Sequence, residues 1–149
     1  MNCDVISIFN INRILIPKLR ARNKRSAIIN ISSGTGVYLT GRVGVYSSAK
    51  LILDVYSRVL SLENKDKMDV ISMRPFGVTT KMMKMKKGPF MISPRAFAKE
   101  SLGELLAGHD VSFGHSRHKA MVSLAFEGKN EEESFKVFDA LWDAAKVNN

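Results

Sequence analysis

The chain has 149 residues, of which 45% are apolar and 25% charged. These proportions are typical of a soluble globular domain and too apolar for a disordered tail, and the length accommodates one core. No stretch approaches the roughly 18 consecutive apolar residues of a membrane-spanning helix. No basic region precedes an apolar segment at the start, so we expect no signal peptide in this stretch. The single Cys3 excludes a disulfide framework and a Cys-rich zinc module, and it fits a reducing compartment.

The formal net charge of +9 is unevenly distributed along the chain. Eighteen of the 23 basic residues lie before residue 100, together with only five of the 14 acidic residues. A basic front of this kind suits nucleic acid, an anionic membrane or a phosphorylated small ligand. The basic residues do not alternate with aromatic ones and no nucleic-acid motif occurs, so we expect a phosphate-bearing small molecule and no nucleic-acid partner.

The first half of the chain predicts two helices and one strand. Apolar residues that recur at threes and fours predict a helix over residues 4–19, although Pro17 is unfavourable near its end. After a basic connector, the apolar run at residues 27–31 predicts a strand buried on both faces. Residues 32–44, rich in Ser, Thr and Gly, predict a loop. A second helix is predicted over residues 46–64. Its apolar side comprises Ala49, Ile52, Val55, Tyr56, Val59 and Leu60.

The second half continues the alternation. Residues 69–73 predict another buried strand, ended by Pro75, and Ser93-Pro94 opens a helix that runs to about residue 106. A third short strand is predicted within residues 111–118. Residues 131–146 predict an amphipathic helix with acidic residues in its first turn. Its expected inward side chains are Phe135, Phe138, Leu141, Trp142 and Ala145. This alternation of helices and strands is typical of an α/β fold with a parallel sheet.

Three side chains near the first strand form a candidate catalytic group. Tyr46 and Lys50 are four residues apart at the start of a helix, so they share one face. A lysine ammonium beside a phenol favours the phenolate, so we expect the pKa of Tyr46 to lie below its usual value of about 10. Ser33 follows the strand, at the end of a parallel sheet where such folds bind ligands. Its hydroxyl can bind the substrate oxygen that Tyr46 protonates. The alternative is an ordinary surface pair and an ordinary loop serine.

The complete string is more specific than these residues taken singly. A buried strand ending in Asn-Ile-Ser-Ser, twelve residues and then Tyr-Ser-Ser-Ala-Lys resembles the signature of the short-chain dehydrogenase/reductase family. The resemblance implies that Ser33 orients the substrate carbonyl and that Tyr46 donates the proton. It implies that Lys50 lowers the pKa of Tyr46, and that Tyr46 and Lys50 hold the nicotinamide ribose.

The turn after the second strand extends the resemblance. The run from Pro75 to Thr80 is similar to the Pro-Gly-x-Val-x-Thr turn of the family, where Val78 and Thr80 would approach the nicotinamide carboxamide. Phe76 replaces the glycine. An aromatic residue there resembles the branch of microsomal very-long-chain 3-oxoacyl-CoA reductases and 17-beta-hydroxysteroid dehydrogenases. Further features of the same branch are the first seven residues, the Ile-Leu-Ile-Pro-Lys-Leu segment, Thr80-Lys81, Ser93-Pro94 with Phe97 and Lys99, and Gly114 with His118.

Two departures from the family pattern affect the predicted machinery. Asp4 stands where the family places an Asn that positions a water of a proton relay, and it can hold a water only as an acceptor. Asn2, two residues earlier, would face another side of the helix. The Gly-rich turn that binds the pyrophosphate precedes this point in the family, and Gly34-Thr35-Gly36 does not replace it because no helix follows directly.

We therefore predict an α/β fold that is the C-terminal half of a Rossmann-like doubly wound parallel sheet, with the N-terminal cofactor-binding half absent. Residues 1–149 form a single partial short-chain dehydrogenase/reductase domain. The resemblance covers about residues 1–125, and the closing helix within residues 126–149 lies outside it.

The resemblance implies an NAD(P)H-dependent carbonyl reductase or dehydrogenase of the 3-oxoacyl-CoA or hydroxysteroid type, in fatty-acid elongation or steroid metabolism. NADP(H) is favoured over NAD(H) because this branch runs reductively, and the expected partner is a small-molecule substrate, an acyl-CoA or a steroid. The implied location is the endoplasmic reticulum membrane, with the cytoplasm as the alternative, and a homo-oligomer remains open. The alternative function is that of a truncated, non-catalytic remnant that acts only as a binding module.

Residues 81–87, which combine Lys and Met, follow the turn where the family has its substrate lid. One interpretation is a basic, Met-lined lid that accepts an acyl chain and the phosphates of coenzyme A, or that rests on an anionic membrane surface. The other is a solvated charge run. The spacings of His109, His115 and His118 fit no zinc pattern, so we expect no metal. We expect His118 to lie in a strand or in the substrate pocket.

Overall fold

The computed structural model describes residues 2–81, 83, 88 and 90–145, and it confirms the predicted alternation of helices and strands. A π-helical turn at Asn2–Ile6 leads into the first helix, and a 3-10 turn at Gly34–Gly36 follows the first strand. The elements are α1 (Ser7–Arg20), β1 (Ser26–Ile31), α2 (Gly44–Asn64), β2 (Met68–Met73), α3 (Pro94–Leu106), β3 (Val111–Ser112), α4 (Ser116–Ala125) and α5 (Glu131–Ala145). In the described part of the chain, no helix is long and apolar enough to span a membrane.

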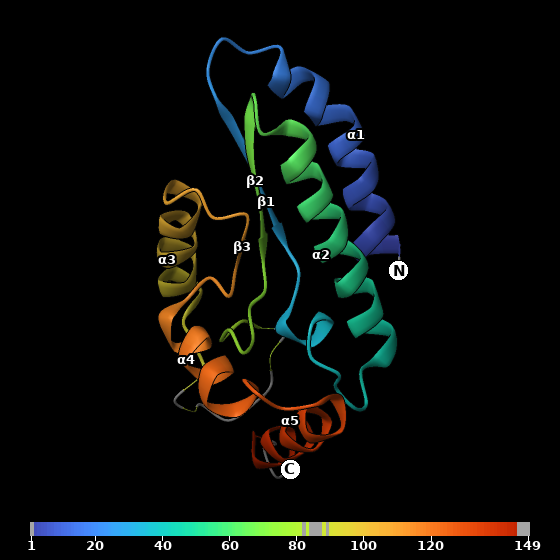
Figure 1. The fold of residues 1–149 in the computed structure, drawn as a ribbon, viewed down its shortest axis with the longest axis vertical. Coiled ribbons are helices and arrows are strands. Elements are labelled where there is room, and N and C mark those ends of the chain that lie inside the picture. The colour runs from blue at the N-terminus through green and yellow to red at the C-terminus, as the bar shows by residue number, and fades with distance from the viewer. Residues whose placement is uncertain (1, 82, 84–87, 89, 146–149) are drawn as a thin grey trace.

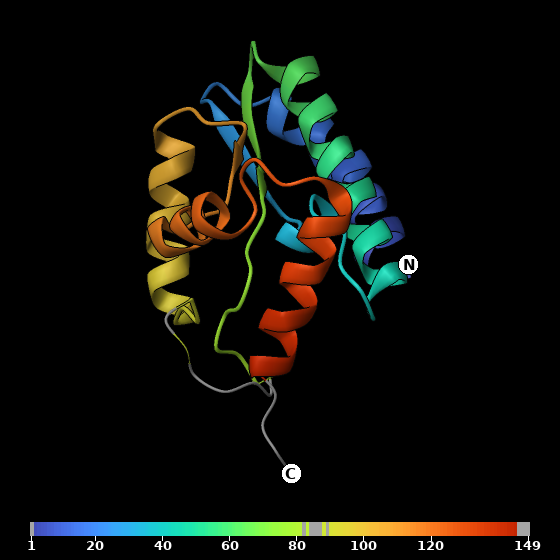
Figure 2. The ribbon, with the colours of Figure 1, turned by 60° about the horizontal axis from the view of Figure 1, so that its bottom comes forward.

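The three strands form one parallel sheet in the order β1-β2-β3, as the alternation predicts. Ser26 pairs with Met68 and Ile31 with Met73, while β3 pairs only with the last residues of β2. Helices α1 and α2 lie on one side of the sheet and α3 and α4 on the other, whereas α5 crosses the carboxyl end of the strands (Figures 1 and 2). This end is therefore enclosed by helices from three directions.

The two longer strands differ in burial. In β2, Val70, Ile71 and Met73 are buried, which confirms the predicted strand with two covered faces. In β1, Asn30 faces α2 and donates a hydrogen bond to Ser57 Oγ at 2.9 Å, whereas Ile31 on the opposite face is 45% exposed. The prediction of burial on both faces is wrong for β1, because α3 packs against β2 on that side of the sheet.

The buried faces of α2 and α5 also differ from the prediction. Three predicted inward residues of α2, Ile52, Val55 and Val59, are exposed, whereas Ala49 and Leu60 are buried as predicted. The buried face is completed by Leu53 and by polar side chains: Asp54, Ser57, Ser61 and Asn64. Hydrogen bonds to the sheet determine which face is buried, and hydrophobic periodicity does not detect them. Likewise, Phe135 and Leu141 of α5 are exposed, while Phe138 and Trp142 pack into the aromatic cluster described below.

The segment predicted to contain a third short strand begins with β3, as expected, but it ends in the first turn of a helix. The strand ends at Ser112, and Gly114 adopts a positive φ of 75° that turns the chain. His115 then caps α4, because its Nδ1 accepts a hydrogen bond from the backbone N–H of Arg117 at 3.1 Å. At the other end of the molecule, α1 continues through Pro17 to Arg20, although Pro17 has no N–H to donate to the carbonyl four residues earlier.

A buried ion pair fastens α2 to β2. The carboxylate of Asp54, 2% exposed, accepts hydrogen bonds from Arg74 Nε and Nη2, both at 2.7 Å, and from Ser72 Oγ at 2.6 Å. Burial by itself raises the pKa of Asp54, but the hydrogen bonds from Arg74 and Ser72 outweigh it, so the pKa is lowered. The carboxylate therefore stays ionised in the folded chain at neutral pH.

We predict that Asp54→Asn lowers the free energy of unfolding by about 3 kcal/mol, because it leaves the largely covered Arg74 cation without its anion. Asp66→Asn is the matched control, because Asp66 makes an exposed ion pair with Arg20 and its loss is expected to change stability much less. Because the folded pKa of Asp54 is lowered, its contribution exists above its ordinary pKa and disappears as the pH falls through the folded value. Urea unfolding at several pH values measures both effects, and equal losses in the two variants would contradict the prediction.

Candidate active site

Ser33 lies in the loop that leaves the carboxyl end of β1. Its Oγ accepts hydrogen bonds from the Thr35 backbone N–H at 3.3 Å and the Thr35 hydroxyl at 3.0 Å, and donates to the Pro75 carbonyl at 3.4 Å. The Gly34 N–H donates to the same carbonyl at 2.9 Å. Ser33 is buried, and these bonds tie its loop to the start of the turn that follows β2.

Tyr46 and Lys50 lie on successive turns at the start of α2, and the structure places them on one face as their spacing predicts. The Lys50 Nζ lies 5.5 Å from the centre of the Tyr46 ring. Tyr46 is 41% exposed, so a small molecule at this edge of the sheet can reach it, whereas the Lys50 side chain is 12% exposed. The arrangement thus presents a phenol to solvent with a shielded cation beside it.

Asp4 meets the Lys50 ammonium directly. The Asp4 Oδ1 lies 3.1 Å from Lys50 Nζ, which also donates a hydrogen bond to the Ile31 carbonyl at 3.1 Å. The predicted relay position is therefore adjacent to the predicted catalytic lysine. A carboxylate there offsets part of the positive charge that Lys50 presents to Tyr46. The role of Asp4 in holding a water remains a prediction.

The Ser33 loop is fitted closely against α2. The Ser32 hydroxyl donates a hydrogen bond to the Lys50 carbonyl at 2.7 Å. A Cβ atom at Gly36 would lie 2.8 Å from Leu51 N and 2.9 Å from the carbonyl carbon of Lys50, so only glycine allows this approach. The contact holds Ser33 and Tyr46 at the same edge of the sheet.

The turn that contains Val78 and Thr80 is braced by the segment leading into α3. Val78 forms a parallel bridge with Ile92, the Thr79 N–H donates to the Ile92 carbonyl at 2.8 Å, and the Ile92 N–H donates to the Gly77 carbonyl at 3.0 Å. Val78 is half-buried and Thr80 is exposed. Through Pro75, this turn adjoins the Ser33 loop.

Phe76, which departs from the family pattern, joins this turn to α4. A Cβ atom at Gly34 would lie 2.2 Å from Phe76 Cζ, so the ring covers Gly34 where a side chain would otherwise stand. The ring stacks on Phe126 with centres 5.8 Å apart and planes 11° apart, and on Phe113 at 6.0 Å. Tyr38 adds a fourth ring, 4.6 Å from that of Phe126. Helices α4 and α5 close over this aromatic cluster.

Sequence reasoning missed Arg42, which links the loop before Tyr46 to α5. Arg42 has a φ of +67°, and its guanidinium binds both carboxylate oxygens of Asp143, at 2.7 and 3.0 Å. Its Nε also pairs with Asp139 at 3.2 Å. The signal was the i, i+4 spacing of the two aspartates, which places them on one face of the last helix.

Several predictions fall outside this site or outside the described residues. Residues 82 and 84–87 of the predicted lid and the side chain of Asn2 are not among the described parts. His118 lies on α4 rather than in a strand, while His109 and His115 pair with Glu104 and Glu100, each at 3.0 Å. Over the described ranges, no group of three or more His, Cys, Asp or Glu side chains is placed to hold a metal ion.

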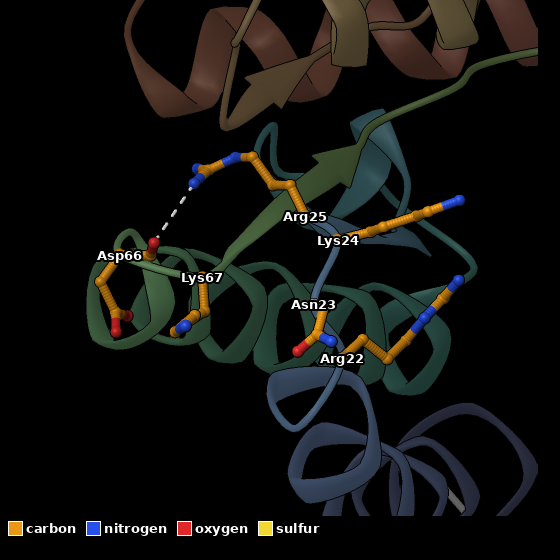
Figure 3. A pocket seen from close by; sticks show the side chains of 6 residues that line it. All are labelled: Arg22, Asn23, Lys24, Arg25, Asp66 and Lys67. Atoms are coloured by element: carbon orange, nitrogen blue, oxygen red, sulfur yellow. Dashed lines mark hydrogen bonds between the residues drawn. The ribbon is translucent and has the colours of Figure 1, made fainter.

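A polar hollow of about 290 Å³ lies at the opposite, amino end of the strands (Figure 3). Arg25 is already bound to Asp69 and to the carbonyl of Lys65, which occupy its guanidinium. Because it lies at the amino end of the strands, the hollow is separate from Ser33 and Tyr46. The residues around it are Arg22, Asn23, Lys24, Arg25, Asp66 and Lys67.

Comparisons with known proteins agree with this geometry. The family model described as short chain dehydrogenase matches residues 1–88, more than half of the chain. The very-long-chain 3-oxoacyl-CoA reductase-B of Danio rerio is 34% identical over 107 residues, which are 70% of this chain and 34% of that protein. The very-long-chain 3-oxoacyl-CoA reductase of Anas platyrhynchos is 33% identical over 105 residues, or 69% of this chain and 33% of that protein.

Solved structures show the same fold at lower sequence identity. A structure described in terms of 7beta-hydroxysteroid dehydrogenase stereoselectivity has a TM-score of 0.73 at 20% identity, and the match covers 93% of this chain and 55% of that one. A short chain dehydrogenase from Escherichia coli CFT073, complexed with NADPH, has a TM-score of 0.60 at 22% identity, over 72% of this chain and 45% of that one. The chain spans about a third of the length of the curated relatives that it matches.

We predict that Gly36→Ala lowers the free energy of unfolding by about 1–3 kcal/mol, because the added methyl group forces the Ser33 loop away from the backbone of α2. Gly44→Ala, at the start of the same helix, is the control, since its Cβ would meet nothing within 4 Å. Urea unfolding measures the loss of stability. A Gly36→Ala chain as stable as the unaltered one would show that the loop does not need this close contact.

Proposed function

Because the chain belongs to the short-chain dehydrogenase family, we propose that it carries the catalytic part of an NAD(P)H-dependent carbonyl reductase. The proposal rests chiefly on one observation, the placement of Ser33, Tyr46 and Lys50 at the carboxyl edge of the sheet, beside the turn of Val78 and Thr80. The substrate class we propose is a 3-oxoacyl-CoA or a steroid ketone, since the curated relatives are named very-long-chain 3-oxoacyl-CoA reductases and one structural neighbour is described as a hydroxysteroid dehydrogenase.

The side chains at this edge fit the nicotinamide end of the cofactor. Lys50 offers an ammonium group to ribose hydroxyls, and Tyr46 stands beside it. The half-buried Val78 and the exposed Thr80 offer an apolar contact and a hydroxyl to the carboxamide. When bound, the cofactor supplies the hydride that adds to the carbonyl carbon. NADP(H) is favoured over NAD(H), because the named activity of the relatives is a reduction.

The proton step follows from Tyr46. As charge develops on the substrate oxygen, the phenol O–H bond breaks and the proton passes to that oxygen, leaving a phenolate beside the Lys50 ammonium. The Ser33 hydroxyl donates a hydrogen bond to the same oxygen. To do so it exchanges the long 3.4 Å bond that it donates to the Pro75 carbonyl, while its bonds from Thr35 stay in place.

We further propose a homo-oligomer and a location at the endoplasmic reticulum membrane. The outer faces of α1 and α2 support the first, since apolar side chains stand exposed along both helices: Ile11, Ile14, Leu15, Ile52, Val55 and Val59. Contact of residues 81–87 with an anionic membrane surface is part of the same proposal, supported by the charge of the run and by the exposure of Lys81.

The rival proposal is a non-catalytic remnant that acts as a binding module. One observation favours it, namely that the Asp4 carboxylate stands at the predicted relay position and pairs with the Lys50 ammonium at 3.1 Å. The two proposals differ in whether Tyr46 has chemistry to perform once a cofactor-binding segment stands before it. The Danio rerio reductase supplies such a segment for the tests that follow.

We predict that Tyr46→Phe lowers the rate of NADPH-dependent carbonyl reduction about 10²- to 10⁴-fold, because the ring is kept and the proton donor is lost. The protein measured is the chain joined behind the amino-terminal part of the Danio rerio reductase, and NADPH binding by fluorescence is expected to persist. Tyr56→Phe on the same helix is the control, since the Tyr56 ring packs on Phe9 at 4.3 Å, away from the site. Unaltered turnover in Tyr46→Phe, or no reduction by the unaltered joined protein, would favour the remnant.

We predict that Asp4→Asn in the same joined protein leaves carbonyl reduction unchanged or raises it, because the amide removes the charge that offsets Lys50. Asp66→Asn serves as the control, because Asp66 forms an exposed ion pair with Arg20 at the opposite end of the sheet. A loss of rate of tenfold or more would show that the Asp4 carboxylate has its own catalytic role.

A further inference from the structure

His118 of α4 is fully buried, and none of the steps proposed above uses it. Its ring lies between those of Phe76 and Phe97, with centres 5.9 and 6.1 Å away. A polar ring in such surroundings is retained only when its nitrogens find partners.

Both nitrogens of His118 are bound to backbone at the edge of the candidate site. The Phe76 N–H donates to Nδ1 at 3.4 Å, and Nε2 lies 3.3 Å from the Gly77 carbonyl and 3.2 Å from the Phe90 carbonyl. Nε2 faces two acceptors and therefore carries the proton, while Nδ1 faces a donor and therefore accepts. The neutral Nε2–H form satisfies all three of these contacts.

These contacts join the turn that contains Val78 and Thr80 to the segment that pairs with it. One segment is the turn beginning at Phe76, and the other is the stretch from Phe90 that pairs with it through Ile92. The helix α4 thereby holds both segments through a single side chain. No other side chain of the described residues donates to both the Gly77 and Phe90 carbonyls.

Protonation of the ring would break this arrangement. A proton on Nδ1 would face the Phe76 N–H, so the bond would be lost. Burial lowers the pKa of His118, and hydrogen bonds to the Gly77, Phe113 and Phe90 carbonyls offset this only in part. The titratable group whose charge acts on the ring is His115, on the same helix, with ring centres 6.2 Å apart. His115 in turn pairs with Glu100 of α3.

We propose that His118 is a positioning residue. In its neutral form it holds the Phe76–Gly77 peptide against the Phe90 segment, and so sets the place of Val78 and Thr80, and it releases the turn when its ring is protonated. The role of this turn in binding the nicotinamide rests on the function proposed above. The role of His118 in holding the turn is independent of that function, and it is tested on the 149-residue chain by itself.

Residue-resolved amide hydrogen exchange provides the first test. His118→Phe keeps an aromatic ring but leaves the Phe76 N–H without its acceptor, and the Phe76 amide is expected to exchange about tenfold faster or more. His118→Asn restores an acceptor near the position of Nδ1, so protection is expected to return. His109→Asn, at an exposed histidine, is the control, and the Ile71 amide of β2 reports on the fold as a whole. Unchanged Phe76 exchange in a folded His118→Phe chain would overturn the proposal.

The pH dependence of the unaltered chain provides the second test, and it decides the matter if His118→Phe does not fold. After correction for the intrinsic exchange rate, protection of Phe76 relative to Ile71 is expected to fall as the His118 ring resonances report protonation. Protonation of His118 without loss of Phe76 protection would contradict the proposal that the protonated ring releases the turn. A His118 ring that stays neutral until the chain unfolds would contradict it as well.

The consequence for the cofactor is measured in the joined protein. His118→Phe is expected to raise the KM for NADPH about tenfold, with a smaller effect on the KM for the ketone. An unchanged KM alongside faster Phe76 exchange would overturn the positioning role while leaving Tyr46 as the proton donor. Absence of reduction in the unaltered joined protein would overturn the proposed function and leave the exchange result standing.

Discussion

The ion pair between Asp54 and Arg74 is the contact on which the geometry of the carboxyl edge depends. Asp54 belongs to α2, which presents Tyr46 and Lys50, and Arg74 directly precedes the turn that holds Val78 and Thr80. A bidentate pair between planar groups fixes both distance and orientation, so the helix and the strand end cannot shift independently. The buried charges are satisfied by each other and by Ser72, which makes such a contact tolerable away from water.

Around this pair, the edge is assembled mainly by backbone contacts between loops. The Gly34 N–H and the Ser33 hydroxyl bind the Pro75 carbonyl, and the Ser32 hydroxyl binds the Lys50 carbonyl. Phe76 stands where the family has a glycine, and it is accommodated because Gly34 leaves room for its ring. The substitution therefore extends the core toward α4 rather than filling the edge that faces a substrate.

Charge is distributed across this edge in pairs that are remote in sequence. Lys50 lies against Asp4, 46 positions earlier, and Arg42 lies against Asp139 and Asp143 of the last helix. In the second contact the two oppositely charged parts of the chain meet, because acidic residues near its end pair with a basic residue of its first half. Helix α5 is thereby bound to the loop that leads into Tyr46, although it lies outside the recognised family pattern.

The sequence alone determined the alternation of elements, the parallel sheet and the group of Ser33, Tyr46 and Lys50, because these follow from local periodicity and from a spacing that a helix converts directly into a shared face. It did not determine which face of α2 is buried, because Asn30–Ser57 and Asp54–Arg74 are hydrogen-bonded pairs between distant segments. Helix α4 and the contacts of Arg42 and His118 were likewise decided only by tertiary structure. A cap such as His115 is recognisable once the chain has turned at Gly114, and a histidine such as His118 acquires its tautomer from carbonyls some 30 to 40 positions away.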